Sequence, residues 1–272
     1  MNTSPLRTLR NKAKLMPLLV NYFPNGISVF IDMFARSLEC SFYMIKHFPK
    51  IKVFASDNDS NVSNLWNLIF NENIQQRNKD VSQLLELIEC TGINQNVWEL
   101  CKENKFETNI YKAFSFLYLS NFGYMGKPET LLHDTQDNGI EILIKSIKDI
   151  LKFYADKITF IHSDFIDISL PMRDRMKQYY NQFVFCDPPY LNKGNNYEDK
   201  DWNEIKLRTL IEKNIKSGLK FGICEFWNNE TDKIFNEYNL NINLVSERVN
   251  LKTRDTEIFA TNYKPEKLLF EI

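Results

Sequence analysis

Short apolar blocks that end at a polar residue recur along the chain. Five of them are typical of buried strands, at residues 28–34, 51–57, 158–164, 182–187 and 219–224. Apolar residues at helical spacing over 38–48 separate the first two blocks, which favours a β-α-β unit with parallel strands. Four of the blocks carry a carboxylate near their end, namely Asp32, Asp57, Asp164 and Asp187. Because parallel strands end at one edge of a sheet, this pattern predicts an α/β fold with an acidic crevice at that edge.

The remaining patterns complete the sheet and add a helical segment. We expect residues 241–250 and 256–262 to form an antiparallel pair, and further helices over 59–70, 203–216 and 231–238. From about residue 65 to 157 only helical patterns occur, such as those over 81–90, 106–122 and 141–154. The sequence therefore predicts two domains. Residues 1–64 and 156–272 would form the sheet domain, and residues 65–155 a helical insertion beside the crevice.

The composition excludes disordered, collagen-like and coiled-coil proteins. With 43% hydrophobic and 25% charged residues, the chain resembles an ordinary globular protein, and no window approaches the roughly 18 apolar residues of a membrane helix. We expect a cytoplasmic protein without a membrane partner. The net charge of −1 means that a nucleic acid would be held by local patches. The five cysteines and three histidines show no metal-ligand spacing, so no metal is predicted.

One tetrapeptide points to specific chemistry. Asp187-Pro188-Pro189-Tyr190 directly follows the apolar run that ends at Cys186. A carboxylate at Asp187 and the carbonyl of Pro188 would accept the two N–H groups of an exocyclic base amine and aim its lone pair at an electrophilic methyl group. The prolines remove competing N–H donors, and Tyr190 offers a ring on which a displaced base can stack. The alternative is a plain proline turn with Asp187 as a turn former.

The order of motifs resembles a known family. The Asp-Pro-Pro-Tyr sequence comes late in the chain, after Asn11-Lys12, a Phe-x-Asp-x-Phe block over 30–34, Ala55-x-Asp57 and the stretch Ser120-Asn121-Phe-Gly-Tyr, and before Asp255-Thr-Glu257-Ile. This order is similar to that of the alpha-type DNA adenine methylases.

The resemblance implies a fold, a donor and an acceptor. The fold would be a class I methyltransferase-type, seven-stranded mixed sheet with helices on both faces, and the insertion would recognise the target. The donor would be S-adenosyl-L-methionine, and the acceptor would be N6 of a flipped adenine in double-stranded DNA. A cognate restriction endonuclease is an expected companion, no obligate protein partner is evident, and the protein would act on the nucleoid DNA of a bacterium or phage.

The resemblance also assigns site residues. Catalysis would rest on Asp187, Pro188, Pro189 and Tyr190, and cofactor contacts on Thr8, Lys12, Asp32, Phe34, Ala35, Ser37, Asp57, Asp164, Phe165 and Asp187. Within this set, Asp57 would bind the ribose hydroxyls, Asp164 and Phe165 the adenine of the cofactor, and Lys12 its methionine end or the site entrance. Asp57 could instead cap the following helix, so both interpretations stay open.

DNA contacts are expected from four residues, Asn121, Lys127, Lys193 and Tyr197. Lysines in these segments could equally be solvated charges, and salt-dependent binding needs only several phosphate contacts. Tyr197 and the nearby Trp202 could brace displaced bases or form the hydrophobic lip of the next helix.

Two positions depart from the family pattern. The cofactor loop usually carries glycine where this chain has Arg36, and the N-terminal motif usually has an aromatic residue and a glycine where Thr8 and Arg10 stand. Glycine permits a positive φ and a close approach to ligand, so arginine at these places threatens the cofactor site by strain and bulk. One alternative function is therefore a catalytically impaired DNA-binding protein on a methyltransferase scaffold. Another is methylation of cytosine N4 or of RNA.

Overall fold

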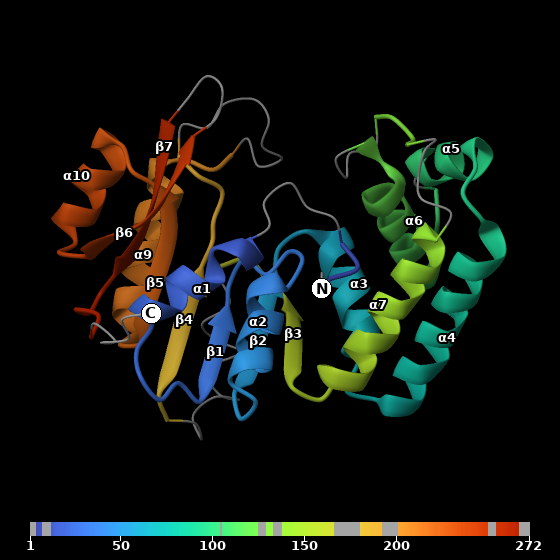
Figure 1. Cartoon of the computed structure of the whole chain (residues 1–272), viewed down its shortest axis with the longest axis horizontal. Coiled ribbons are helices and arrows are strands. Elements are labelled where there is room, and N and C mark those ends of the chain that lie inside the picture. The colour runs from blue at the N-terminus through green and yellow to red at the C-terminus, as the bar shows by residue number, and fades with distance from the viewer. Residues whose placement is uncertain are drawn as a thin grey trace.

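A seven-stranded sheet forms the centre of the protein in a computed structural model, which describes residues 4–6, 12–103, 105–124, 129–132, 138–165, 180–191, 201–249 and 254–266. The strand order is β3-β2-β1-β4-β5-β7-β6 (Figure 1). The strands are β1 (Val29–Asp32), β2 (Lys52–Asp57), β3 (Ile158–His162), β4 (Gln182–Cys186), β5 (Lys220–Phe226), β6 (Asn241–Val249) and β7 (Arg254–Thr261).

Strand directions place the predicted acidic groups at one edge. Strand β1 pairs in parallel with both β2 and β4, β2 with β3, and β4 with β5. Strand β7 is antiparallel to β5 and β6, so it closes the sheet as expected. Asp32 and Asp57 are the last residues of β1 and β2, and Asp187 directly follows β4. The predicted seven-stranded mixed α/β sheet is confirmed.

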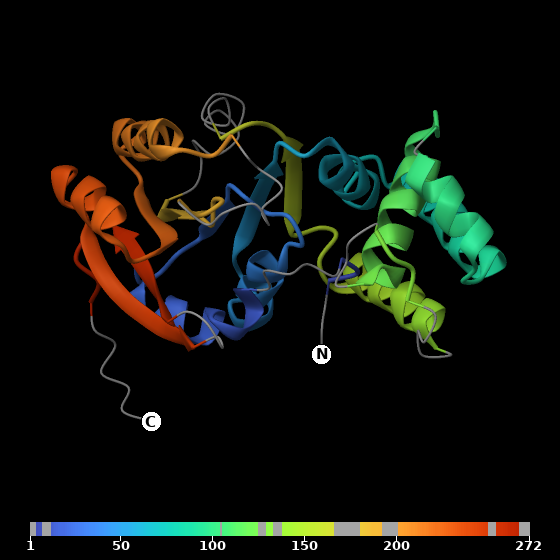
Figure 2. The ribbon, with the colours of Figure 1, turned by 90° about the horizontal axis from the view of Figure 1, so that it is seen from above.

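Helices cover both faces of the sheet because strand side chains alternate between two hydrophobic clusters. Phe30 packs into the cluster that also holds residues of α1, α2 and α3, whereas Val29 and Ile31 pack with α9 and α10. Figure 2 shows α9 and α10 on the opposite side of the sheet from α1 and α2. The helix bounds are α1 (Met16–Leu19), α2 (Glu39–His47), α3 (Ser60–Ile69), α9 (Glu204–Ser217) and α10 (Asn229–Glu237), with short 3-10 turns η1 (Lys12–Lys14) and η2 (Val20–Tyr22) before β1.

The segment between β2 and β3 is helical, as the pattern predicts. Beyond α3 it forms α4 (Ile74–Thr91), α5 (Gln95–Glu103), α6 (Asn109–Phe122) and α7 (Gly139–Phe153), grouped beside the β3 edge of the sheet (Figure 1). Helix α5 has no counterpart among the helices named from the sequence; it is nine residues long and buries Trp98 and Cys101. In the part of the chain that the structure describes, no helix is long and apolar enough to cross a membrane.

Candidate active site

A cavity of about 340 Å³ opens where β1, β2 and β4 end, and we refer to it as the edge pocket. The residues predicted for cofactor binding that line it are Lys12, Asp32, Phe34, Ala35, Ser37, Asp57, Asp164, Phe165 and Asp187, and Pro189 of the catalytic tetrapeptide lines it as well. They come from five separate stretches of sequence. The structure thus brings the predicted set together at one sheet edge, which is the place that parallel-strand topology favours for a ligand.

Asp57 is held by backbone donors on both carboxylate oxygens. Its Oδ2 accepts from the backbone N–H of Arg36 at 2.9 Å, and its Oδ1 accepts from the N–H of Asp59 at 2.9 Å. Burial raises the pKa of this carboxyl group. The N-cap of α3 is Asp59, which accepts from the N–H groups of Asn61 and Val62. The alternative in which Asp57 caps the helix is therefore wrong, and Asp57 is positioned by the loop to face the pocket.

Arg36 occupies the backbone conformation that the departure from glycine made suspect. Its φ is 35°, and that of Leu38 two residues later is 58°. A left-handed backbone at a residue with a Cβ costs roughly 1–2 kcal/mol. The strain is held in place because the Arg36 N–H donates to Asp57 and its carbonyl accepts from Trp66 Nε1 at 2.6 Å, while Leu38 is fully buried. The loop keeps the path that glycine would permit, at a cost in strain.

Asp32 is a buried lining residue of the edge pocket. The residue is 2% exposed, and its carboxylate accepts from the Ser41 hydroxyl at 2.7 Å. Burial raises the pKa of Asp32 to about 7, partly offset by the bond from Ser41, while the neighbouring carboxylates of Asp187 and Asp57 raise it further. Near neutral pH this group is therefore shared between its protonated and ionised forms.

Three aromatic side chains form one wall of the edge pocket. The ring centroids of Phe34 and Phe165 are 5.7 Å apart, and Trp202 packs against both at 5.7 and 5.5 Å. Trp202 Nε1 is buried and has no hydrogen-bond partner among the described residues. The sequence left Trp202 open between a brace for displaced bases and the hydrophobic lip of the next helix. Neither interpretation named Phe34 or Phe165 as its partners, because these residues lie far away along the chain. A buried N–H donor without a partner beside a cavity suits a polar ligand.

The tetrapeptide predicted to be catalytic, residues 187–190, directly follows β4 and belongs to no helix or strand. Tyr190 is buried, its hydroxyl donates to Asp187 Oδ1 at 3.2 Å, and its ring meets that of Phe226 edge-on at 4.6 Å. Burial raises the pKa of Tyr190 well above its usual value, with Asp187 adding to the rise. Stacking of a base on Tyr190 stays a prediction.

Lys12 connects the N-terminal segment to this turn and to β7. Its ammonium donates to the Tyr190 hydroxyl and lies 3.5 Å from Asp187 Oδ1 and 3.3 Å from Glu257 Oε1. It also lies 4.7 Å from the centroid of the Tyr190 ring. Burial by itself would lower the pKa of Lys12, but Asp187 and then Glu257 are among the negative groups that raise it above its usual value. Lys12 lines the pocket as predicted, but its ammonium contacts Asp187 and Tyr190, which are predicted to be catalytic.

Two buried glutamates were missed as functional residues. Glu257 supports Lys12, and its only sequence signal was its place in the Asp255-Thr-Glu257-Ile stretch. Glu225, an acidic residue inside the apolar strand β5, accepts from the N–H of Leu191 at 2.6 Å and thereby fixes the residue after the turn. Burial raises the pKa of Glu225 to about 8, although backbone donors oppose the rise. A carboxylate within an apolar strand was the signal that could have found it.

The predicted DNA contacts receive less support. Asn121 is 8% exposed, and its amide donates to the carbonyls of Pro5 at 2.6 Å and Leu117 at 2.9 Å. Its burial does not favour the predicted role in DNA binding, which stays a prediction. Five further positions named from the sequence lie outside the described residues, namely Thr8, Arg10, Lys127, Lys193 and Tyr197. Within the described ranges, no group of three or more possible ligands could hold a metal ion.

Residues 11–251 match the family described as D12 class N6 adenine-specific DNA methyltransferase. The chain belongs to this family. The resemblance inferred from the motif order is confirmed.

Two curated relatives are named as a modification methylase and a type II methyltransferase. Modification methylase StsI of Streptococcus sanguinis is 22% identical over 288 aligned positions, which cover 96% of this chain and 43% of that protein. Type II methyltransferase M.FokI of Planomicrobium okeanokoites is 22% identical over 235 positions, covering 81% and 35%. The chain thus spans less than half the length of these relatives. Among solved structures, M. capricolum TrmK in complex with S-adenosyl-homocysteine aligns at a TM-score of 0.42 and 10% identity, covering 95% of this chain and 71% of that one.

Proposed function

We propose that this protein transfers a methyl group from S-adenosyl-L-methionine to N6 of adenine at specific sites in double-stranded DNA. The observation that carries the proposal is the position of Asp187 at the edge pocket, directly after β4 and next to the cofactor-binding residues expected from sequence. Membership of the D12 class family supports the same acceptor.

The edge pocket fits the proposed donor. Asp57 offers carboxylate oxygens at the end of β2, which suits the ribose hydroxyls. Phe34, Phe165 and Trp202 supply the apolar wall for the adenine ring, and Asp164 lies beside them to accept from its amino group. Trp202 Nε1 is buried without a hydrogen-bond partner among the described residues. When bound, the donor would supply the electrophilic methyl group.

The residues of this chain would prepare the amine. Asp187 and the Pro188 carbonyl would accept the two N–H groups, which frees the nitrogen lone pair for an in-line attack. Because a paired adenine cannot reach Asp187, the target base would leave the duplex, and Tyr190 would provide the ring beside it. Lys12, held by Glu257, would fix the Asp187 carboxylate and the Tyr190 hydroxyl before the base arrives.

The names of the relatives support a restriction-modification role. A cognate restriction endonuclease would then cut the same site when it is unmethylated. Two other functions remain as alternatives from the sequence. The strained Arg36 favours the impaired DNA-binding protein, and the amine geometry alone would also serve cytosine N4 or RNA.

Methyl transfer from labelled donor separates these functions. Purified protein and its Asp187→Ala variant would be incubated with double-stranded DNA and with RNA, and modified positions would be mapped in DNA from a methylation-free host that expresses the protein. The proposal expects N6-methyladenine at one recurring sequence with the parent protein only. Absence of transfer with intact DNA binding would favour the impaired protein, and N4-methylcytosine or labelled RNA would favour the other acceptors.

A further inference from the structure

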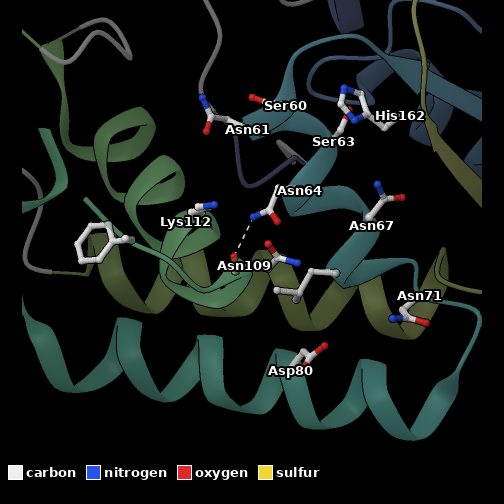
Figure 3. Close-up of a pocket in the computed structure, with 12 residues that line it drawn as sticks. Ser60, Asn61, Ser63, Asn64, Asn67, Asn71, Asp80, Asn109, Lys112 and His162 are labelled. Atoms are coloured by element: carbon white, nitrogen blue, oxygen red, sulfur yellow. Dashed lines mark hydrogen bonds between the residues drawn. The ribbon is translucent and has the colours of Figure 1, made fainter. Parts of the chain in front are cut away.

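A second cavity among the described residues lies outside the edge pocket. It is a groove of about 720 Å³ between α3, α4 and the start of α6, and we call it the α3 groove (Figure 3). No role described above uses it. Its size is within the range of ligand-binding clefts.

One wall of the α3 groove is a row of amides. Asn61, Asn64, Asn67 and Asn71 line it, and their spacing of three or four residues puts them along one side of α3 and its end. The Asn64 amide donates to the carbonyl of Asn109 at 2.8 Å (Figure 3). The side chains of Asn61 and Asn67 have no hydrogen-bond partner among the described residues. Amides both donate and accept, so this row can bind phosphate oxygens, sugars or base edges.

The other wall adds a cation and an aromatic pair. Lys112 lines the groove from α6 and has no ion-pair partner among the described residues. Phe106 also lines it and stacks on Tyr111, with centroids 5.8 Å apart and planes 14° apart. The one acidic lining residue, Asp80, comes from α4 and lies toward Asn71, away from Asn61 (Figure 3). A lysine beside amides and rings is the combination that nucleic-acid strands bind.

The α3 groove begins where the edge pocket ends. Residues 57–59 line the edge pocket, and Ser60 and Asn61, which follow directly, line the groove. His162 at the end of β3 lines the groove and contacts the carbonyl of Asn58 at 3.2 Å. The N-terminal turn of α3 therefore separates the two cavities on the same edge of the sheet. A long ligand that reaches Asp187 across this edge would continue toward Asn61.

We propose that the α3 groove binds the backbone of double-stranded DNA on one side of the target adenine. The proposal rests on the proposed function, because DNA is what must lie across this edge. The groove walls are mostly polar, with Leu68 as the one aliphatic lining residue among those described, which disfavours a protein helix that would need an apolar surface. The sequence predicted DNA contacts at Asn121, Lys127, Lys193 and Tyr197, none of which is among the described lining residues of the groove, and it counted Lys112 only as a basic residue near the crevice. The groove adds a second contact region, on α3 and the start of α6.

Two groove variants test this contact. Asn61→Asp places a carboxylate in the first turn of α3, where a negative charge favours the helix but repels phosphate. Lys112→Ala removes the cation. Binding would be measured by fluorescence anisotropy with a labelled duplex that the parent methylates, over a range of salt concentrations. Calorimetric titration with S-adenosyl-L-methionine would check the edge pocket.

The matched controls change residues that are not among the described lining residues of the groove. Gln75→Glu makes the same change from amide to carboxylate at the equivalent position of α4, which starts near the opposite edge of the sheet, and Lys216→Ala removes an exposed lysine from the end of α9. We expect Asn61→Asp to raise the Kd for DNA roughly tenfold and Lys112→Ala to reduce the salt slope by about 1, with cofactor affinity and both controls unchanged.

Unchanged DNA affinity in both groove variants would overturn the proposed contact and leave the proposed function standing. Equal weakening in the controls would overturn it too, because the effect would then follow from charge alone. Failure of the parent protein to methylate any DNA would instead contradict the proposed function.

Discussion

The β2 end and the β4 end of the edge pocket hold their carboxylates by different means. At the β2 end, Asp57 accepts from the backbone N–H groups of Asp59 and Arg36, which are 2 and 21 residues away in sequence. At the β4 end, Asp187 is bonded to side chains, and its partner Lys12 is 178 residues from Tyr190 and 245 from Glu257. Backbone donors hold their geometry as long as the loop keeps its path. Charged side chains hold theirs only if every partner is present.

The difference matches the tasks proposed for the two ends. A carboxylate that binds ribose needs a fixed position and little else, so a rigid loop suffices. A carboxylate that accepts from a reacting amine needs a defined charge and direction, which a buried ion pair can supply. We therefore expect substitutions at the β4 end to affect turnover and stability strongly, and substitutions at the β2 end to affect mainly cofactor affinity.

The largest effect is expected from Asp187→Ala at the β4 end. Removing the acceptor of the amine should lower turnover by roughly 10³-fold or more, because the interaction forms only with the reacting base. DNA affinity should stay close to that of the parent, since phosphate contacts provide it. Initial rates and anisotropy on the same duplex measure both. Retention of substantial turnover would remove Asp187 from the mechanism.

Glu257→Gln tests whether the β4 end depends on its complete set of charges. Losing one partner of a buried ion pair should reduce the free energy of unfolding by roughly 3–5 kcal/mol. Urea unfolding measures this change. Glu237→Gln breaks an exposed pair with Arg208 and serves as the control, with little expected change. A variant as stable as the parent would show that Lys12 is held by Asp187 and Tyr190 without Glu257.

Asp32, between the two ends, should make stability depend on pH. Its pKa rises from 3.8 to about 7 on folding, so the folded protein binds more protons in this window and stability falls as pH increases from about 4 to about 7. Asp32→Asn should remove this loss and be more stable than the parent by roughly 2–4 kcal/mol at pH 8, with little difference at pH 4. Urea midpoints at several pH values measure it. Parallel pH profiles for the two proteins would contradict the proposed burial cost.

The smallest effect is expected at the β2 end, from Arg36→Gly. Relief of a left-handed backbone should stabilise the loop by roughly 1–2 kcal/mol and tighten binding of S-adenosyl-L-methionine, measured by calorimetry. Asn239→Gly relieves another positive φ, at 54° and away from the pocket, so it should leave cofactor affinity unchanged. Weaker binding by Arg36→Gly would mean that the arginine itself contacts the cofactor.

The strands, the parallel direction of most of them and most helices could be predicted from the sequence, because each depends on the pattern of apolar and polar residues close together in the chain. The apolar block before Asp187 and the helical spacing after Asp57 are properties of adjacent residues. The division of the chain into residues 1–64 with 156–272 and residues 65–155 stays a proposal, and residue 65 falls inside α3. The acidic residues at the strand ends could be predicted to lie together, because parallel strands end at the same edge of a sheet.

By itself, the sequence determined the fold class, the family and the acidic groups at the sheet edge, since each depends on short motifs or periodicity. Only the tertiary structure decided what each polar group contacts. It placed Trp202 beside Phe165, joined Lys12 to Glu257, and gave the cap of α3 to Asp59. It also showed that Arg36 adopts a positive φ, and it aligned the amides of α3 against Lys112. The physical reason is distance along the chain: partners far apart in sequence leave no periodic signal, and their contacts exist only once the sheet has formed.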